Sequence, residues 1–104
     1  MASMSKHERA LSYAKRLKAA EDVYAEARAI RREVNSLVWS ESNKPLPLDE
    51  KIAILEEAKH IILKGKRDQA GRIIIEAGDN SGIIDVITNI EQNLKIERDL
   101  EAET

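Results

Sequence analysis

The chain has 104 residues, no cysteine, and a formal net charge of -2 from 17 basic and 19 acidic side chains. This length fits one small domain with a modest core, and the lack of cysteine excludes a disulfide framework. Aromatic residues make up only 3% of the chain, which excludes a stacking platform for bases or a flavin. Neither a signal-peptide pattern nor an apolar run of ~18 residues is present. We therefore expect one cytoplasmic helical domain over 1–104 with an aliphatic core.

The segment from Ser5 to about Trp39 is expected to form one long helix. Ser5 and Glu8 form a capping box, in which each side chain satisfies a free amide of the first turn. Apolar residues then recur at alternating steps of three and four, which places them on one narrow stripe. A helix of ~35 residues would be about 50 Å long, longer than one small core covers, so we expect the stripe to pack against a second copy. The predicted oligomer interface consists of Leu17, Ala20, Val23, Ala27, Ile30 and Val34.

The Ser- and Pro-containing stretch 40–47 is the clearest helix breaker, because each proline disfavours helix at the residue before it. A pair of acids then marks a new helix N-terminus, and apolar residues resume helical spacing. The two helices would form a long hairpin. Gly65 would either end the second helix or be tolerated inside it at about 1 kcal/mol. We expect one helix over 49–78.

Glycines bound the stretch 78–82, which predicts a helix stop and a new start near Ser81. An alternative is a β-hairpin within 72–88, because β-branched runs flank this turn. The second run keeps a helical period through Leu94, which favours helix. Residues 97–104 are expected to be an acidic frayed tail, and Met1 to Ser3 a cloning remnant ahead of a native start. The predicted fold class is all-α, a long helical hairpin plus a C-terminal helix in a homo-oligomeric helical bundle.

Basic residues gather in two groups that are candidates for binding a phosphate or another anion. Over 59–72, five basic residues and one acid surround Gly65, whose backbone could approach a phosphate if the helix breaks there. The second group lies at 28–32. The candidate ligand-binding residues are Arg28, Arg31, Lys64, Lys66 and Arg67. The alternative is a set of solvated faces that pair with acidic neighbours, since 73–104 carries eight acids and two basic residues. Long nucleic acid is not expected, because the chain is slightly acidic and has no sequence-reading motif.

Patterns for catalysis and for metals point away from an enzyme. The two histidines lack a partner at zinc spacing, and neither a nucleophile elbow nor a phosphate-binding glycine loop is present. We expect no catalytic residues, no metal and no cofactor. The carboxylates Glu56, Glu57, Glu76 and Asp79 are similar to the spaced Mg²⁺ ligands of the all-helical MazG-type nucleotide pyrophosphohydrolases. Where that family carries a further Glu one turn after the pair, this chain has His60.

Over about 23–64, a long helix, a Ser/Pro-containing loop and a second helix with Leu55-Glu56-Glu57-Ala58 resemble the helical hairpin of the phage-encoded anti-CBASS sponges. Those anti-defence proteins are small oligomers that sequester cyclic nucleotide signals. The resemblance implies oligomerisation and basic residues at subunit junctions that contact phosphates. From the residues themselves we expect a small non-enzymatic binding or regulatory protein that acts through protein–protein association. Its partner would be another protein or a small phosphate-containing ligand. The alternatives are an oligomeric cyclic-nucleotide sponge and a MazG-like pyrophosphohydrolase.

Overall fold

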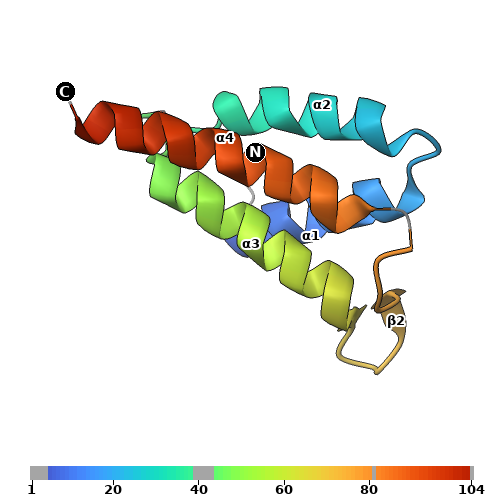
Figure 1. The fold of residues 1–104 in the computed structure, drawn as a ribbon. Coiled ribbons are helices and arrows are strands. Elements are labelled where there is room, and N and C mark those ends of the chain that lie inside the picture. Colours follow the sequence, from blue (N-terminus) through green and yellow to red (C-terminus); the bar gives the residue numbers. More distant parts are fainter. Residues whose placement is uncertain (1–4, 39–43, 81, 104) are drawn as a thin grey trace.

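The computed structural model describes residues 5–38, 44–80 and 82–103 (Figure 1). These residues are mostly helical, which confirms the predicted predominance of helix. The elements in chain order are α1 (Lys6–Ala19), α2 (Val23–Asn35), α3 (Leu48–Lys64), β1 (Lys66–Arg67), β2 (Ile73–Ile75) and α4 (Ile83–Ala102). No helix of the described part is both long enough and apolar enough to cross a membrane.

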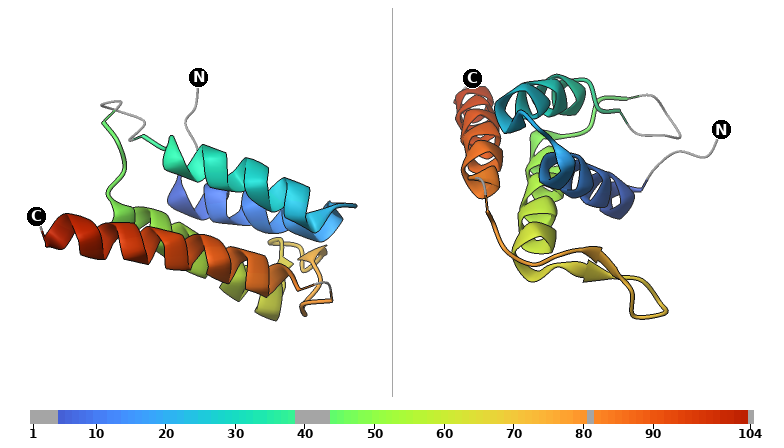
Figure 2. Two further views of the ribbon diagram at one scale, coloured as in Figure 1. Left: turned by 45° about the horizontal axis from the view of Figure 1, so that its top comes forward. Right: turned by 90° about the vertical axis from the view of Figure 1, so that its right-hand side faces the viewer.

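The four helices within the described residues surround one aliphatic core. α3 packs against α1 on one side and α4 on the other, and α2 contacts both α1 and α4 (Figures 1 and 2). Successive helices reverse direction, so α1 and α3 run one way while α2 and α4 run the other. α1 and α3 share the most extensive interface, whereas α2 packs much less extensively on α4. The seam between α2 and α4 is therefore more open than the one between α1 and α3.

The predicted long N-terminal helix is wrong, because the chain forms two helices there. Ala20 and Asp22 both have extended backbone, and the Asp22 carboxylate accepts a hydrogen bond of 3.1 Å from the Ala25 amide. Asp22 is thus the N-cap of α2, a position that aspartate favours because its side chain satisfies a free amide. The chain folds back at this point, and α1 and α2 turn their apolar stripes toward the same core.

The residues predicted to form an oligomer interface lie mostly inside the chain's own core. Leu17, Ala27, Ile30 and Val34 are buried by other parts of the same chain, Val23 packs against them, and Ala20 is half-buried at the end of α1. The stripe that seemed too long for one core is divided between two helices that cover each other. In this fold most of these side chains are therefore not exposed for contact with a second copy.

The expected continuation of the second helix through Gly65 is also wrong. α3 ends there, because Gly65 has φ +79° and ψ 175°, a conformation that cannot continue a helix. The chain then forms a β-hairpin in which β1 pairs antiparallel with β2. The carboxylate of Asp68 closes the turn by accepting hydrogen bonds of 2.9 Å from the Ala70 and Arg72 amides. Residues 73–75 are a strand, but their partner is 66–67 and not the alternative partner within 83–88, which is helical.

α4 begins at Ile83, two residues after the start predicted near Ser81. Ser81 itself lies outside the described residues. The Asp79 carboxylate accepts hydrogen bonds from the amides of Ile83 at 2.7 Å and Ile84 at 3.1 Å. The helix then continues to Ala102, so 97–102 of the predicted tail is helical. The predicted remnant Met1 to Ser3 lies outside the described residues, as does the first half of the breaker, 40–43. Near the end of this breaker, the Leu46 amide donates a 3.0 Å hydrogen bond to the Leu37 carbonyl.

Candidate binding site

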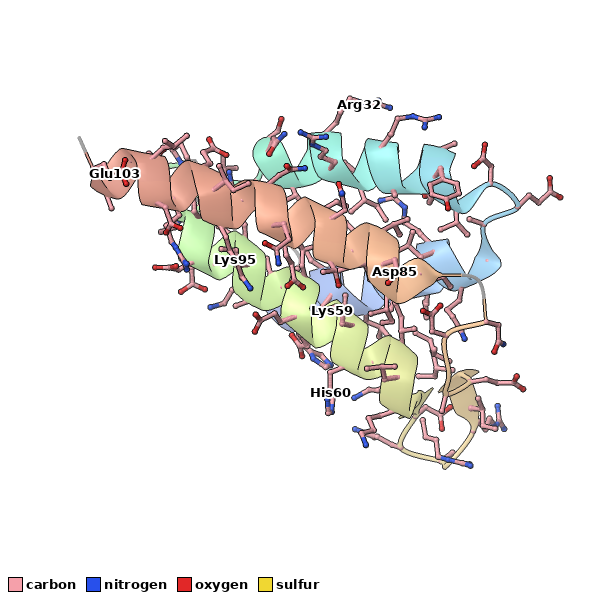
Figure 3. All side chains as sticks on the ribbon, in the orientation of Figure 1. Arg32, Lys59, His60, Asp85, Lys95 and Glu103 are labelled. Carbon is pink, nitrogen blue, oxygen red and sulfur yellow. The ribbon has the colours of Figure 1, made fainter. Side chains whose placement is uncertain are left out.

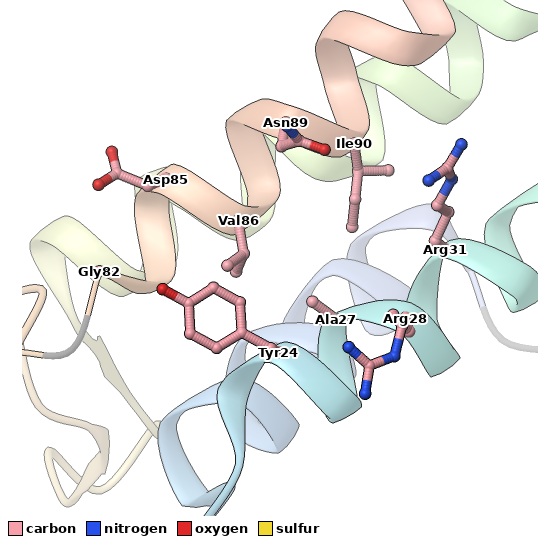
Figure 4. Close-up of a pocket in the computed structure, with 9 residues that line it drawn as sticks. All are labelled: Tyr24, Ala27, Arg28, Arg31, Gly82, Asp85, Val86, Asn89 and Ile90. Carbon is pink, nitrogen blue, oxygen red and sulfur yellow. The ribbon is translucent and has the colours of Figure 1, made fainter.

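A groove follows the seam between α2 and α4. The part next to Tyr24 and the start of α4, which we call the upper part, has a volume of about 360 Å³ (Figure 4). It continues into a second hollow of about 250 Å³ that reaches Leu100, and both hollows are lined by Arg31 and Ile90. We call this continuous feature the α2–α4 groove. The residues lining its upper part are Tyr24, Ala27, Arg28, Arg31, Gly82, Asp85, Val86, Asn89 and Ile90.

Helical spacing explains which side chains reach the upper groove. On α2, Tyr24, Arg28 and Arg31 follow one another at steps of four and three, so they share one face of the helix. Ala27 lies between them and is buried, and its small side chain leaves room above the core. From α4, Val86 contributes apolar surface opposite. The groove therefore has an apolar floor and polar rims.

The groove residues on α2 combine exposed aromatic surface with positive charge. Tyr24 is 70% exposed, and its ring points toward α4 in Figure 4. Arg28 and Arg31 are exposed and make no hydrogen bond or ion pair with any described residue. In the same view the Arg31 guanidinium extends toward α4 beside Ile90, whereas the Arg28 guanidinium extends away from α4. The two cations line one groove but do not converge on one point.

The other three predicted ligand residues lie elsewhere. Lys64, Lys66 and Arg67 line a hollow of about 620 Å³ between the end of α3 and the β-hairpin. Arg67 already donates a 2.8 Å hydrogen bond to the Gly71 carbonyl. Gly65 does break the helix, but its backbone approaches the chain itself, since a Cβ there would lie 2.8 Å from the Ile75 carbonyl oxygen. The five predicted residues thus divide between two separate places.

Arg16, which the sequence did not single out, holds one wall of the groove in place. Its Nε donates to Glu26 at 2.6 Å, and two of its nitrogens reach the Glu33 carboxylate at 2.8 and 2.6 Å. These hydrogen bonds raise the pKa of Arg16, and the bond from Arg16 lowers the pKa of Glu33. Because Arg16 belongs to α1 and both glutamates belong to α2, the ion pairs fix the position of α2 beside the groove.

Glu91 is a buried charge that the sequence analysis also missed. It is 1% exposed on α4, and its Oε2 accepts a 3.1 Å hydrogen bond from Lys59 Nζ on α3. Its other oxygen has no partner among the described residues. Lys59, labelled in Figure 3, was counted in the basic group, but it is committed to this pair. The sequence feature that could have indicated this buried charge is the spacing, because Glu91 lies four residues after Ile87 and therefore on the apolar face of the helix.

Three of the four carboxylates that resemble a pyrophosphohydrolase site make other contacts, and the fourth, Glu76, lies apart from the helices. Glu56 lies 4.0 Å from the Lys95 ammonium, and Glu57 contacts His7. Asp79 caps α4, and Glu76 follows β2 outside any helix. Within residues 5–38, 44–80 and 82–103, no three His, Cys, Asp or Glu side chains group closely enough to hold a metal ion.

Neither the protein-family models, nor the curated proteins, nor the solved structures give a match to this chain. The class of protein is therefore argued from the groove and the surface alone.

Proposed function

We propose that this protein is a small non-enzymatic binding protein that associates with another protein through the α2–α4 groove. The observation that carries the proposal is the form of the groove, which is elongated, open to solvent and apolar at its floor. Such a groove suits the apolar face of an amphipathic helix, which places anchors at steps of three and four. Tyr24 and the two arginines are residue types that dominate binding energy at protein interfaces.

Charge indicates which helix would fit. The α2 rim carries Arg28 and Arg31, neither of which has a partner among the described residues. A partner helix with acidic residues along that edge would pair with both, and it would not need the guanidinium groups to converge. This divergence is the reason for preferring a protein partner over a single phosphate group, which needs several donors directed at one point.

The test is selection of helical peptides from a displayed random library, followed by mapping of the best binder by NMR chemical shifts. We expect the selected peptides to carry apolar residues at steps of three and four with acids along one side. They should perturb signals of α2 and α4 around Tyr24 and Ile90. The double variant Arg28→Glu/Arg31→Glu should weaken binding about tenfold or more, whereas Lys15→Glu on the exposed side of α1 should not. Binders that lack acids, or that map to another surface, would refute the proposal.

A second candidate, sequestering of a cyclic nucleotide, has one observation in its favour. Tyr24 and Arg31 share one face of α2 above a hollow of about 360 Å³, a volume within the usual range for ligand sites. The chain has too few aromatic residues for a platform that stacks several bases, but the single exposed ring of Tyr24 could stack on one base while the guanidinium holds a phosphate. A melting-temperature screen over cyclic di- and trinucleotides tests it, because a ligand that binds only the folded state raises stability. A shift lost in Arg31→Ala but kept in Lys15→Ala would support this candidate. No shift at millimolar ligand would remove it.

A further inference from the structure

The molecule carries opposite charges at the two ends of its long axis, which measures 46 Å. The β-hairpin lies at one end and the last turns of α4 at the other (Figures 1 and 2). Four basic residues and two acids lie around the hairpin, namely Lys64, Lys66, Arg67 and Arg72 with Asp68 and Glu76. Four acids and one basic residue lie within 97–103. We call these regions the basic end and the acidic end.

The acidic charges are placed unfavourably within one copy. The last turn of α4 contains no basic residue, although the C-terminal end of a helix is the negative pole of its dipole and favours cations. Arg98 offsets part of the charge, since it contacts Asp49 at 2.9 Å and Asp99 at 3.7 Å. Glu97 has no partner among the described residues. A positively charged surface from outside the chain would relieve this arrangement.

Both ends also expose large apolar side chains beside their charges. Ile96 and Leu100 lie on the acidic end, and Leu63 and Ile73 lie on the basic end. Each of these four side chains is 50% to 60% exposed. At the basic end, Ile73 lines the hollow of about 620 Å³ together with Lys64 and Lys66. The two ends thus match in apolar surface and are opposite in charge.

We propose that two copies of this chain associate antiparallel, with the last turns of α4 from each copy lying in the hollow beside the hairpin of the other. This arrangement forms the same contact twice and closes on itself, which is the commonest symmetry of soluble oligomers. It buries Leu100 against Ile73 and brings Glu97 to Lys64 and Lys66. The dimer covers Glu97 and Leu100 in the second hollow of the α2–α4 groove but leaves the upper part around Tyr24 and Arg28 open, so a peptide can bind there whether or not the dimer forms.

The first measurement is sedimentation of the whole chain over a range of concentrations at low and high salt. At low salt and tens of micromolar we expect a species of about twice the 11.7 kDa chain mass. Raising the ionic strength to about 1 M shortens the screening length from about 10 Å at 0.1 M to about 3 Å, and should weaken association about tenfold or more. A monomer under all low-salt conditions would overturn the proposal, and so would an open series of larger species.

Charge reversal distinguishes this dimer from nonspecific association. The acidic-end variant Glu97→Lys/Glu103→Lys should be monomeric yet fold at least as stably, because cations suit the end of α4. The basic-end variant Lys64→Glu/Lys66→Glu should also be monomeric. When the two variants are mixed, both contacts again join opposite charges, so the mixture should recover the dimer. Lys15→Glu/Arg32→Glu, which reverses two exposed charges elsewhere, should dimerise like the unmodified chain.

Two results would show that the dimer uses another surface. One is a dimer that persists in either end variant, and the other is a mixture that stays monomeric although both variants are folded by circular dichroism. Peptide binding to the groove can be measured in the monomeric basic-end variant, whose two substitutions lie outside the groove, so failure of the dimer and failure of the proposed function are separately visible.

Discussion

Replacing Gly65 by alanine should damage the junction between α3 and the β-hairpin. The residue has φ +79° and ψ 175°, a region that is essentially restricted to glycine and costs other residues of order 1–3 kcal/mol. The added Cβ would also lie 2.8 Å from the Ile75 carbonyl oxygen and 3.0 Å from the Ala77 amide nitrogen. Both atoms belong to backbone that cannot move without disturbing β2. We expect a total loss of about 3 kcal/mol or more from the free energy of unfolding, out of the roughly 5–15 kcal/mol of a typical domain.

Gly71→Ala is the matched control, because Gly71 has φ +82° but a Cβ there would meet nothing within 4 Å. It should cost only the left-handed backbone strain, about 1–2 kcal/mol. The gain from restricting the unfolded chain is common to both changes and cancels in the comparison. Urea unfolding followed by circular dichroism gives both free energies. If Gly65→Ala costs no more than Gly71→Ala, the close contact with the hairpin does not exist as described and the reasoning fails.

Four further variants test the buried and paired side chains. Lys59→Met should cost roughly 3 kcal/mol in urea unfolding, because it leaves the Glu91 carboxylate buried without a partner, and Lys59→Met/Glu91→Leu should recover most of that loss. Tyr13→Phe should be neutral or stabilising at pH 7, since the buried Tyr13 hydroxyl makes no hydrogen bond among the described residues. Burial, and secondarily Glu33, raise the pKa of Tyr13, so ionisation of this group leaves the stability of the fold unchanged below the ordinary tyrosine pKa of about 10 and lowers it as the pH rises above that value. Unfolding curves should show a smaller alkaline loss in Tyr13→Phe. Arg16 lowers the pKa of Glu33, so this carboxylate stabilises the fold above the ordinary glutamate pKa of about 4.3 and loses that effect as the pH falls. Arg16→Met should therefore lower stability at pH 7 and reduce the acid-dependent part of the loss, and an unchanged pH profile would contradict this.

Local signals in the sequence predicted the helix starts better than the helix ends. The hydroxyl of Ser5 accepts a 3.1 Å hydrogen bond from the Glu8 amide, as half of the expected capping box requires. Asp22 carries an equally good capping signal, but the apolar spacing continues across it. Spacing alone does not distinguish one straight helix from two that fold back, because both bury the same stripe. The packing of α1 and α2 against α3 and α4, which lie far away in the sequence, is what distinguishes two helices from one.

The β-hairpin depended on residues whose importance was not apparent from their spacing. Asp68 and Gly71 form the turn, and three successive isoleucines supply the strand. Ile73 and Ile74 also fit a helical pattern, which is why the helix was expected to continue. The strand is paired with 66–67, and Gly65 approaches the Ile75 carbonyl closely; these contacts join residues that are up to about ten positions apart, and no local pattern encodes them.

Two of the five predicted ligand residues line the candidate site, and the sequence did not predict what lies opposite them. Arg28 and Arg31 do line one groove, yet the residues opposite them come from α4, which lies more than fifty positions away in the chain. Lys59 belongs to a buried pair because Glu91 occupies a core position. A charged residue on an apolar stripe is a usable signal for such a pair, although the sequence cannot name its partner.

The extensive interface between α1 and α3 has a consequence for synthesis of the chain. α1 and α2 leave the ribosome first, but they contact each other much less than α1 contacts α3. Their apolar stripes therefore have little to cover them until α3 has been made, about thirty residues later. At typical elongation rates of about 5–20 residues per second, this interval lasts a few seconds. During it the nascent N-terminal half presents an uncovered apolar surface, which is the kind of surface that chaperones bind and that neighbouring nascent chains can misassemble through.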